Sequence, residues 1–243
     1  MTIPHIVFQT WKSREIPDHW LPSVRSIETH LPDWGYKLMT DRDNRRLVAT
    51  YFPDFLPYYD NFPYPIQRAD AIRACLLYLY GGLYLDLDYE LQAPLDHLFA
   101  NGDLFLVPSG NLSSMYTNSF MASRAHHPFW LAYIEEMKRP PPWWAVGKHL
   151  HVMTTTGPMA LTRAIQRTGY PHIQLPSRLI TPCSVCDLHC RTSDQSLVHQ
   201  LEGGSWNGWD SRFYNWWLCN WRGVVIIVAL FILSSIIIWA IIS

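Results

Sequence analysis

The chain has 243 residues, of which 49% are hydrophobic and 16% are charged, and its formal net charge is -1 at pH 7. This length and apolar fraction suffice for one sizeable domain with its own hydrophobic core. The sequence contains no block of lysine and arginine, so duplex nucleic acid, which favours a concentrated basic surface, is not expected as a partner.

Short apolar stretches suited to buried strands alternate with helical stretches along the chain. We expect strands at residues 3–8, 36–39, 104–107 and 119–122. This alternation predicts an α/β fold in which a mostly parallel or mixed sheet is covered by helices. In such folds, ligands bind beyond the carboxyl ends of the strands.

The clearest helix begins at Pro65, because apolar residues then recur at helical spacing as far as Tyr80. The following glycine pair, at 81–82, is typical of a helix end. A strand at 83–87 is expected directly afterwards. Further along, a second helix is predicted to begin at Pro158, which suits a first helical turn.

The stretch LYLDLDYE contains two aspartates on alternate positions, Asp86 and Asp88. In a strand they would share one face with Tyr84, roughly 6 to 7 Å apart at the backbone, and would repel each other. A Mg²⁺ or Mn²⁺ ion would remove that conflict and keep open positions for phosphate oxygens, so a nucleoside diphosphate is the expected ligand. The alternative is a strand end where both aspartates are simply hydrated.

One helix earlier, Asp70 and Arg73 stand three residues apart and therefore share one helix face. An ordinary ion pair would explain them. An enzyme that handles a sugar nucleotide would instead use the carboxylate to accept from hydroxyls and the guanidinium to donate to a phosphate or hydroxyl.

Three cysteines, Cys183, Cys186 and Cys190, lie close together in the sequence. Their spacing, even with nearby histidines, matches no common four-ligand zinc pattern well. A local disulfide or free thiols are favoured over structural zinc.

Residues 223–242, GVVIIVALFILSSIIIWAII, carry no charge, and about twenty such residues suffice to cross a hydrocarbon core of roughly 30 Å. We predict a single transmembrane helix here, the alternative being a buried hydrophobic helix. Trp209, Trp216, Trp217 and Trp221 precede it, which predicts a juxtamembrane stem over 207–222.

Membrane orientation is predicted from the few charges that flank this span. No signal peptide is visible in residues 1–8, and Arg212 and Arg222 lie on the N-terminal side of the span. The positive-inside bias then places the globular domain on the cytosolic side, with the Golgi or ER lumen as the alternative.

The segment QRADAIRACLLYLYGGLYLDLD at 67–88 resembles the signature of family 32 glycosyltransferases, which have a sugar-binding region with a DXD motif. Further similar segments follow in the family's order: IPHIVFQTW at 3–11, NSFMAS at 118–123, HHPFW at 126–130, TTGPM at 155–159 and HQLEGGSW at 199–206. The subgroup that mannosylates inositol phosphorylceramide is the most similar.

The resemblance implies a GT-A fold, a Rossmann-like nucleotide-sugar-binding fold, in a catalytic domain over residues 1–206, with the C-terminal transmembrane helix added. It implies that Asp88 binds Mn²⁺ or Mg²⁺ directly, and that Asp86 holds the ribose and supports the metal through water. Asp70 and Arg73 would orient the donor sugar.

The same resemblance implies further donor contacts. The implied residues are Gln9, Thr10 and Trp11 at the base, Asn118 at the sugar hydroxyls, and Ser205 and Trp206 over the diphosphate. His199 would be a third metal ligand or contact the diphosphate. The alternatives are purely structural roles, with Trp11 as a core aromatic and His199 as a structural histidine.

The implied activity is metal-dependent, retaining transfer of a hexose to a membrane-associated acceptor. The favoured donor is GDP-mannose and the favoured acceptor an inositol phosphorylceramide-like glycolipid. One alternative is transfer from UDP-glucose or UDP-galactose to a protein or glycan. The other is a membrane adaptor that has kept the fold and lost catalysis.

Overall fold

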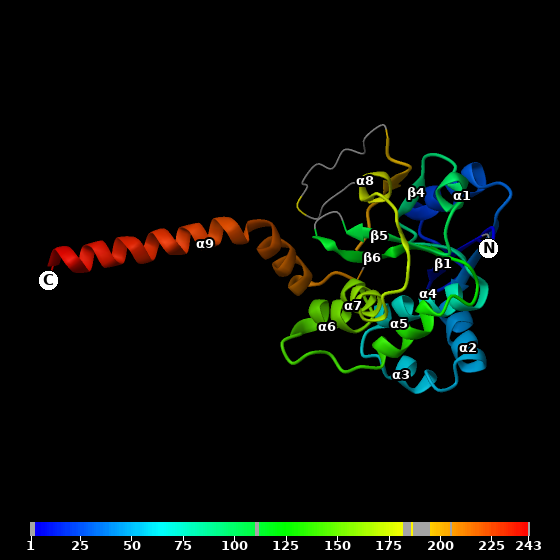
Figure 1. The fold of residues 1–243 in the computed structure, drawn as a ribbon, viewed down its shortest axis with the longest axis horizontal. Helices are drawn as coiled ribbons and strands as arrows, with labels where there is room; N and C mark the ends of the chain where they lie inside the picture. The colour runs from blue at the N-terminus through cyan, green and yellow to red at the C-terminus, as the bar shows by residue number, and fades with distance from the viewer. Residues whose placement is uncertain (1–2, 110–111, 182–185, 187–194, 205, 243) are drawn as a thin grey trace.

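A six-stranded mixed sheet forms the centre of the computed structural model, with strands in the order β2-β1-β3-β6-β5-β7 (Figure 1). Its strands are β1 (Ile6–Trp11), β2 (Gly35–Thr40), β3 (Gly82–Leu85), β5 (Leu104–Ser109), β6 (Leu112–Ser123) and β7 (Ile173–Gln174). β1 runs parallel to β2 and β3, whereas β6 is antiparallel to both β3 and β5. A second, two-stranded antiparallel sheet joins β4 (Tyr89–Leu91) to β8 (Val198–Gln200).

The structure describes residues 3–109, 112–181, 186, 195–204 and 206–242, with side chains described except at 112–114 and 226–242. The helices are α1 (Leu21–His30), α2 (Asp41–Tyr51), α3 (Leu56–Asn61), α4 (Pro65–Tyr80), α5 (Phe129–Met137), α6 (Gly147–Thr155), α7 (Pro158–Thr168), α8 (Ser177–Ile180) and α9 (Trp209–Ile242). Short 3-10 turns lie at Asp18–Trp20 and Asp96–Phe99.

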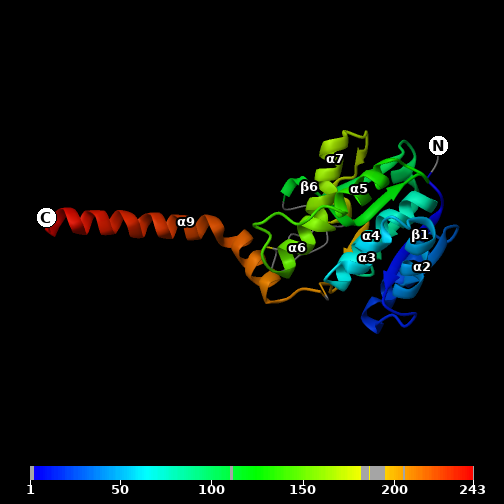
Figure 2. The same cartoon turned by 90° about the horizontal axis from the view of Figure 1, so that it is seen from below.

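Two hydrophobic cores lie on opposite faces of the sheet. Helices α2, α3, α4, α5 and α7 cover the face to which Phe8 and Tyr84 belong, and Figure 2 shows α3 and α4 in front of the sheet. Helices α1 and α8, with the small sheet, cover the face to which Val7 and Leu83 belong. Adjacent residues thus enter different cores, as strand alternation requires. The predicted α/β fold with a mixed, helix-covered sheet is confirmed.

Most predicted elements lie close to their observed bounds. The strands predicted at 36–39, 104–107 and 119–122 fall within β2, β5 and β6. The first strand begins three residues later than predicted, at Ile6, because the amide of Ile6 turns back to the carbonyl of Pro4 (2.8 Å).

Helix α4 has the bounds that the sequence predicts, with Pro65 at its first position. Gly81 ends it with φ of +64°, a conformation that favours glycine. A Cβ at Gly81 would lie 2.4 Å from the amide nitrogen of Ala125, so no other residue fits this close approach without movement.

The strand predicted at 83–87 is shorter than expected, because β3 ends at Leu85. The amide of Asp86 still donates to the carbonyl of Ser119 (2.9 Å), but Tyr89 then closes a turn onto the carbonyl of Asp86 (3.2 Å). The two aspartates therefore lie in a tight turn between the two sheets instead of on an extended strand. The reason is that Tyr89 onward pairs with β8 in the small sheet.

Helix α9 projects from the body of the protein and includes most of the predicted stem and the segment 223–242 (Figure 1). Among the residues whose side chains are described, no helix has the length and apolar character that crossing a membrane requires. The predicted C-terminal transmembrane helix is thus not found in the structure, and the side chains of 226–242 lie outside its described part.

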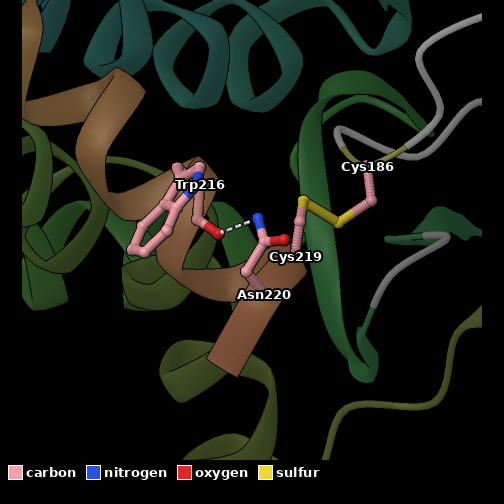
Figure 3. Close-up of a disulfide and its surroundings, with 4 residues drawn as sticks. All are labelled: Cys186, Trp216, Cys219 and Asn220. Atoms are coloured by element: carbon pink, nitrogen blue, oxygen red, sulfur yellow. Dashed lines mark hydrogen bonds between the residues drawn. A yellow bond between two sulfur atoms is a disulfide. The ribbon is translucent and has the colours of Figure 1, made fainter. Parts of the chain in front are cut away.

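A disulfide joins Cys186 to Cys219, which are 33 residues apart in the sequence (Figure 3). It ties α9 to the segment that leads into β8, with 5.4 Å between the two Cα atoms. Among the described residues Cys75 is a free, buried thiol. The expectation of a local disulfide or a free thiol is therefore wrong for Cys186, whose partner is distant in the sequence. Cys183 and Cys190, which shared that expectation, lie outside the described residues.

Replacing both Cys186 and Cys219 by serine is expected to lower the free energy of unfolding by about 2 to 4 kcal/mol, because the unfolded chain regains the freedom that a closed loop removes. Denaturant unfolding followed by fluorescence measures the change. Wild-type protein in reductant should show a loss of the same size. Unfolding of the double variant at the denaturant concentration of oxidised wild type would contradict this role.

Candidate functional site

A cavity of about 210 Å³ opens beyond the carboxyl ends of β1 and β3, where the sequence predicts a ligand. Helix α4 forms its floor, the turn after β3 one side, and α6 with the segment before α9 the other. The lining residues are Thr10, Trp11, Trp20, Ile66, Ala69, Asp70, Arg73, Asp86, Leu87, Asp88, Asn118, Val152, Met153, Pro158, Gly204 and Trp206.

Arg73 on α4 lies between two carboxylates at the base of this cavity. Its Nη2 is 3.2 Å from Asp70 Oδ1 and 3.1 Å from Asp86 Oδ1. Its Nη1 donates to the carbonyl of Asn118 (2.8 Å) and its Nε to that of Ala69 (3.3 Å). Since Arg73 is only 5% exposed, protein groups hold most of its donors in a fixed orientation.

Asp70 is buried and receives donors from three elements. Its Oδ1 accepts from Asn118 Nδ2 (2.9 Å), as well as from Arg73, and its Oδ2 accepts from the hydroxyl of Thr156 (3.0 Å). Burial raises the pKa of Asp70 to about 6, against the opposing effects of Arg73 and of the Thr156 hydrogen bond. A carboxylate offers about four acceptor positions, so one position on Oδ2 remains for a ligand hydroxyl.

Tyr84 of β3 holds the side chain of Asp86 in place. The hydroxyl of Tyr84 donates to Asp86 Oδ1 (2.8 Å), and the guanidinium of Arg73 lies over the Tyr84 ring, 4.9 Å from its centroid. Burial raises the pKa of Asp86, while Arg73 and the Tyr84 hydroxyl oppose that shift. Tyr84 and Asp86 do share one face, as the alternation of the sequence predicts.

Asp88 has a buried oxygen, Oδ1, without a hydrogen-bond partner. Burial, and then the charge of Asp86, raise its pKa to about 7. Such an oxygen is costly unless something satisfies it, and a positive charge beside both aspartates would lower both pKa values again. The pair therefore has the character of an incomplete cation site.

The donor set fits a hard divalent cation held with help from a ligand. Among the described residues, no group of three or more His, Cys, Asp or Glu side chains could hold a metal ion by itself. Mg²⁺ is commonly bound through one or two carboxylates together with substrate phosphates, and Mn²⁺ takes similar oxygen ligands. Asp86 and Asp88 supply that number of carboxylates.

Several residues predicted from the sequence meet in this cavity. Asp70, Arg73, Asp86 and Asp88 line it together, and the other predicted residues among its lining are Thr10, Trp11, Asn118 and Trp206. Trp11 is half-buried, and its Nε1 is buried without a hydrogen-bond partner, so its contact with a base stays a prediction.

Two other predicted residues do not line the cavity, and a third lies outside the described residues. Gln9 is fully buried, and its Nε2 donates to Ser23 Oγ (2.9 Å) and to the carbonyl of Asp86 (3.3 Å). It therefore stabilises the turn that carries Asp86 without lining the cavity. His199 is not among the lining residues and pairs with Glu90 in the small sheet. Ser205 lies outside the described residues.

Some residues that complete the site have no role predicted from the sequence. Thr156, which holds Asp70, lies in the TTGPM segment that had been noted only as a motif. Gly203 packs against Asp88, and a Cβ there would lie 2.0 Å from Asp88 Oδ2. The paired glycines of HQLEGGSW were the available signal, since close backbone approach is a common reason for glycine.

Comparison with protein families matches residues 17–105 to the model described as a glycosyltransferase sugar-binding region containing a DXD motif. Inositol phosphoceramide mannosyltransferase 3 of Schizosaccharomyces pombe is 34% identical over 90% of this chain and 60% of that protein. Mannosyl phosphorylinositol ceramide synthase of Saccharomyces cerevisiae is 36% identical over 86% of this chain and 53% of that protein. The chain thus spans somewhat more than half the length of these relatives.

Among solved structures, the PaToxG glycosyltransferase superposes with a TM-score of 0.54 at 14% identity, covering 69% of this chain and 70% of that one. The glycosyltransferase domain of the YGT toxin gives 0.52 at 7% identity, covering 72% and 80%. At these identities the likeness shows the fold alone, which is a GT-A-like mixed α/β arrangement.

Replacing Arg73 by methionine is expected to lower the free energy of unfolding by about 3 to 5 kcal/mol at pH 7, because Asp70 and Asp86 would lose their shared cation. Thermal or denaturant unfolding measures the loss. The matched control is Arg45→Met, which breaks an exposed pair with Asp60 (2.8 Å) and should cost about 1 kcal/mol or less. Equal losses in both variants would contradict the central role of Arg73.

Proposed function

Because the chain belongs to the glycosyltransferase family whose sugar-binding region contains a DXD motif, we propose that it is a hexosyltransferase that uses a nucleotide-sugar donor. One observation supports this most directly. The turn after β3 presents Asp86 and Asp88 to the same cavity as the buried Asp70 and Arg73. An adaptor that had lost catalysis would have no need to keep four such groups together, so that alternative is disfavoured.

We propose mannose as the transferred sugar, GDP-mannose as the donor, and an inositol phosphorylceramide-like glycolipid as the acceptor. The support is the mannosyltransferase and mannosyl phosphorylinositol ceramide synthase activity for which the two relatives are named, and they align over 86 to 90% of this chain. A UDP-hexose donor with a protein or glycan acceptor is the alternative.

We propose Mn²⁺ or Mg²⁺ as the cofactor, since glycosyltransferases with this motif generally depend on a divalent metal. Asp88, with its unpaired Oδ1, would hold the ion directly, and Asp86 would support it. When bound, the metal neutralises charge that develops on the departing diphosphate. His199 is not needed for this arrangement, because diphosphate oxygens can complete the coordination.

The proposed reaction breaks the bond between the anomeric carbon and the diphosphate oxygen and forms a bond from that carbon to the acceptor oxygen. The acceptor oxygen would bond to the carbon on the face that the diphosphate leaves, so the anomeric configuration is retained, and its proton would pass to the departing phosphate oxygen on that face. The free position on Asp70 Oδ2 would accept from a sugar hydroxyl and orient the ring. The fixed charge of Arg73 would stabilise the departing diphosphate without reorganisation.

We propose that a C-terminal anchor, residues 223–242, tethers catalytic residues 1–206 to a membrane through the stem at 207–222. Tethering would raise the effective concentration of a membrane acceptor. The disulfide between Cys186 and Cys219 supports placement in an oxidising compartment, because disulfides are rare in the cytosol. It favours the Golgi or ER lumen over the cytosolic orientation suggested by the flanking arginines.

Asp88→Asn is expected to reduce hexose transfer by about a thousandfold or more while leaving the melting temperature within about 2 °C, because the change removes charge from the proposed metal site without altering shape. Radiolabelled transfer to microsomal lipid measures the activity. Asp33→Asn, on the exposed surface, is the matched control and should retain full activity. Full activity in Asp88→Asn would refute the metal role.

Donor identity is tested by thermal shift of the full chain with Mn²⁺ and each of GDP-mannose, UDP-glucose and UDP-galactose. Stabilisation by GDP-mannose alone is expected, because only a ligand that binds the folded state raises the melting temperature. Stabilisation by a UDP-sugar alone would support the alternative donor. No stabilisation by any of the three would favour the inactive adaptor.

A further inference from the structure

The first turn of α9 contacts the beginning of α6. Asp210 Oδ2 accepts from the backbone amide of His149 (2.7 Å), and its Oδ1 accepts from the amide of Ser211 (2.9 Å). Asp210 is only 6% exposed. Burial would raise the pKa of Asp210, but these amides and His149 hold it below its usual range, so the carboxylate stays charged. It supplies the acceptor that the first amides of α6 need.

Glycine at the start of α6 leaves room for this carboxylate. Gly147 has φ of +84°, and a Cβ there would lie 3.3 Å from Asp210 Oδ2. The hydroxyl of Tyr214, one turn further along α9, also donates to the carbonyl of Val146 (3.4 Å). The first two turns of α9 therefore contact the N-terminus of α6.

His149 connects this junction to the cavity. Its ring stacks between Trp206 and Tyr214, at centroid distances of 5.5 and 5.6 Å and with interplanar angles of 13° and 21°. Its Nδ1 lies 3.0 Å from Ser211 Oγ. Burial lowers the pKa of His149, so the ring in this stack is neutral at pH 7. The two contacts of His149 with α9 hold its ring against Trp206.

Trp206 in turn forms part of the cavity wall. It lines the cavity together with Gly204, and Lys148 of α6 donates to its carbonyl (2.6 Å). The same α6 contributes Val152 and Met153 to the cavity lining. The position of Trp206 therefore depends on α6 and, through His149, on α9.

We infer that His149 and Asp210 are positioning residues that hold Trp206 over the bound nucleoside diphosphate, so that α9 is a working part of the donor site. This inference rests on the proposed function and adds a means by which the anchor helix controls it. Detaching α9 from α6 weakens donor binding, because Trp206 loses the ring that supports it. The disulfide at Cys219 provides a second attachment of α9, to the segment that precedes β8.

The test measures the affinity of the full, oxidised chain for GDP and for UDP, each with Mn²⁺, by titration calorimetry. His149→Ala and Asp210→Ala are expected to raise the Kd of the nucleotide that wild type binds by about tenfold, a size typical of coupled contacts. His149→Phe, which keeps a flat ring in the stack, should restore most of the affinity. His172→Ala is the matched control, because His172 packs edge-to-face against Tyr116 and does not line the cavity.

A double-variant cycle separates positioning from a general loss of stability. In a Trp206→Ala background, His149→Ala should raise the Kd no further, since the ring that it positions is gone. Equal nucleotide affinity in wild type and His149→Ala, or fully additive effects of the two changes, would overturn the inference. Absence of nucleotide binding by wild type would instead refute the proposed function on which it rests.

Discussion

The structure depends on one buried cation, Arg73, held between Asp70 and Asp86. Without it two carboxylates could not approach each other at the junction of α4, β3 and β6, because each would lose its hydration without compensation. The guanidinium also donates to the carbonyl of Asn118, which joins helix to sheet. Charge balance at this point therefore fixes the backbone from which the rest of the site projects.

The turn after Asp86 brings the segment that follows β8 next to Asp88, because the amide of Leu201 donates to the carbonyl of Asp88. Because β4 leaves the large sheet and pairs with β8, the segment that follows β8 is delivered to Asp88. Gly203 permits that approach, since any side chain would collide with the Asp88 carboxylate. The two-stranded sheet thus places Gly204 in the same cavity as residues of α4, which lie more than a hundred residues earlier in the chain.

Helix α9 has a structural role within the domain as well as a proposed role as a tether. Asp210 supplies an acceptor to α6, and Cys219 is bonded to the segment before β8. A helix that leads away from the domain is thereby connected to α6, which lines the cavity, and to the segment before β8.

The sequence by itself determined the elements whose signals are local, and it predicted the carboxylates and the arginine that line the central cavity. Pro65 and Gly81 bound α4 because helix entry and exit depend on the backbone freedom of single residues, and Asp86 and Asp88 were recognisable by spacing. Tertiary structure alone decided that β3 ends early, that Gln9 supports the turn from behind, and that Thr156 holds Asp70. It also decided which cysteines pair. These outcomes depend on contacts between residues far apart in the chain, and no local pattern records which distant groups will satisfy a buried charge.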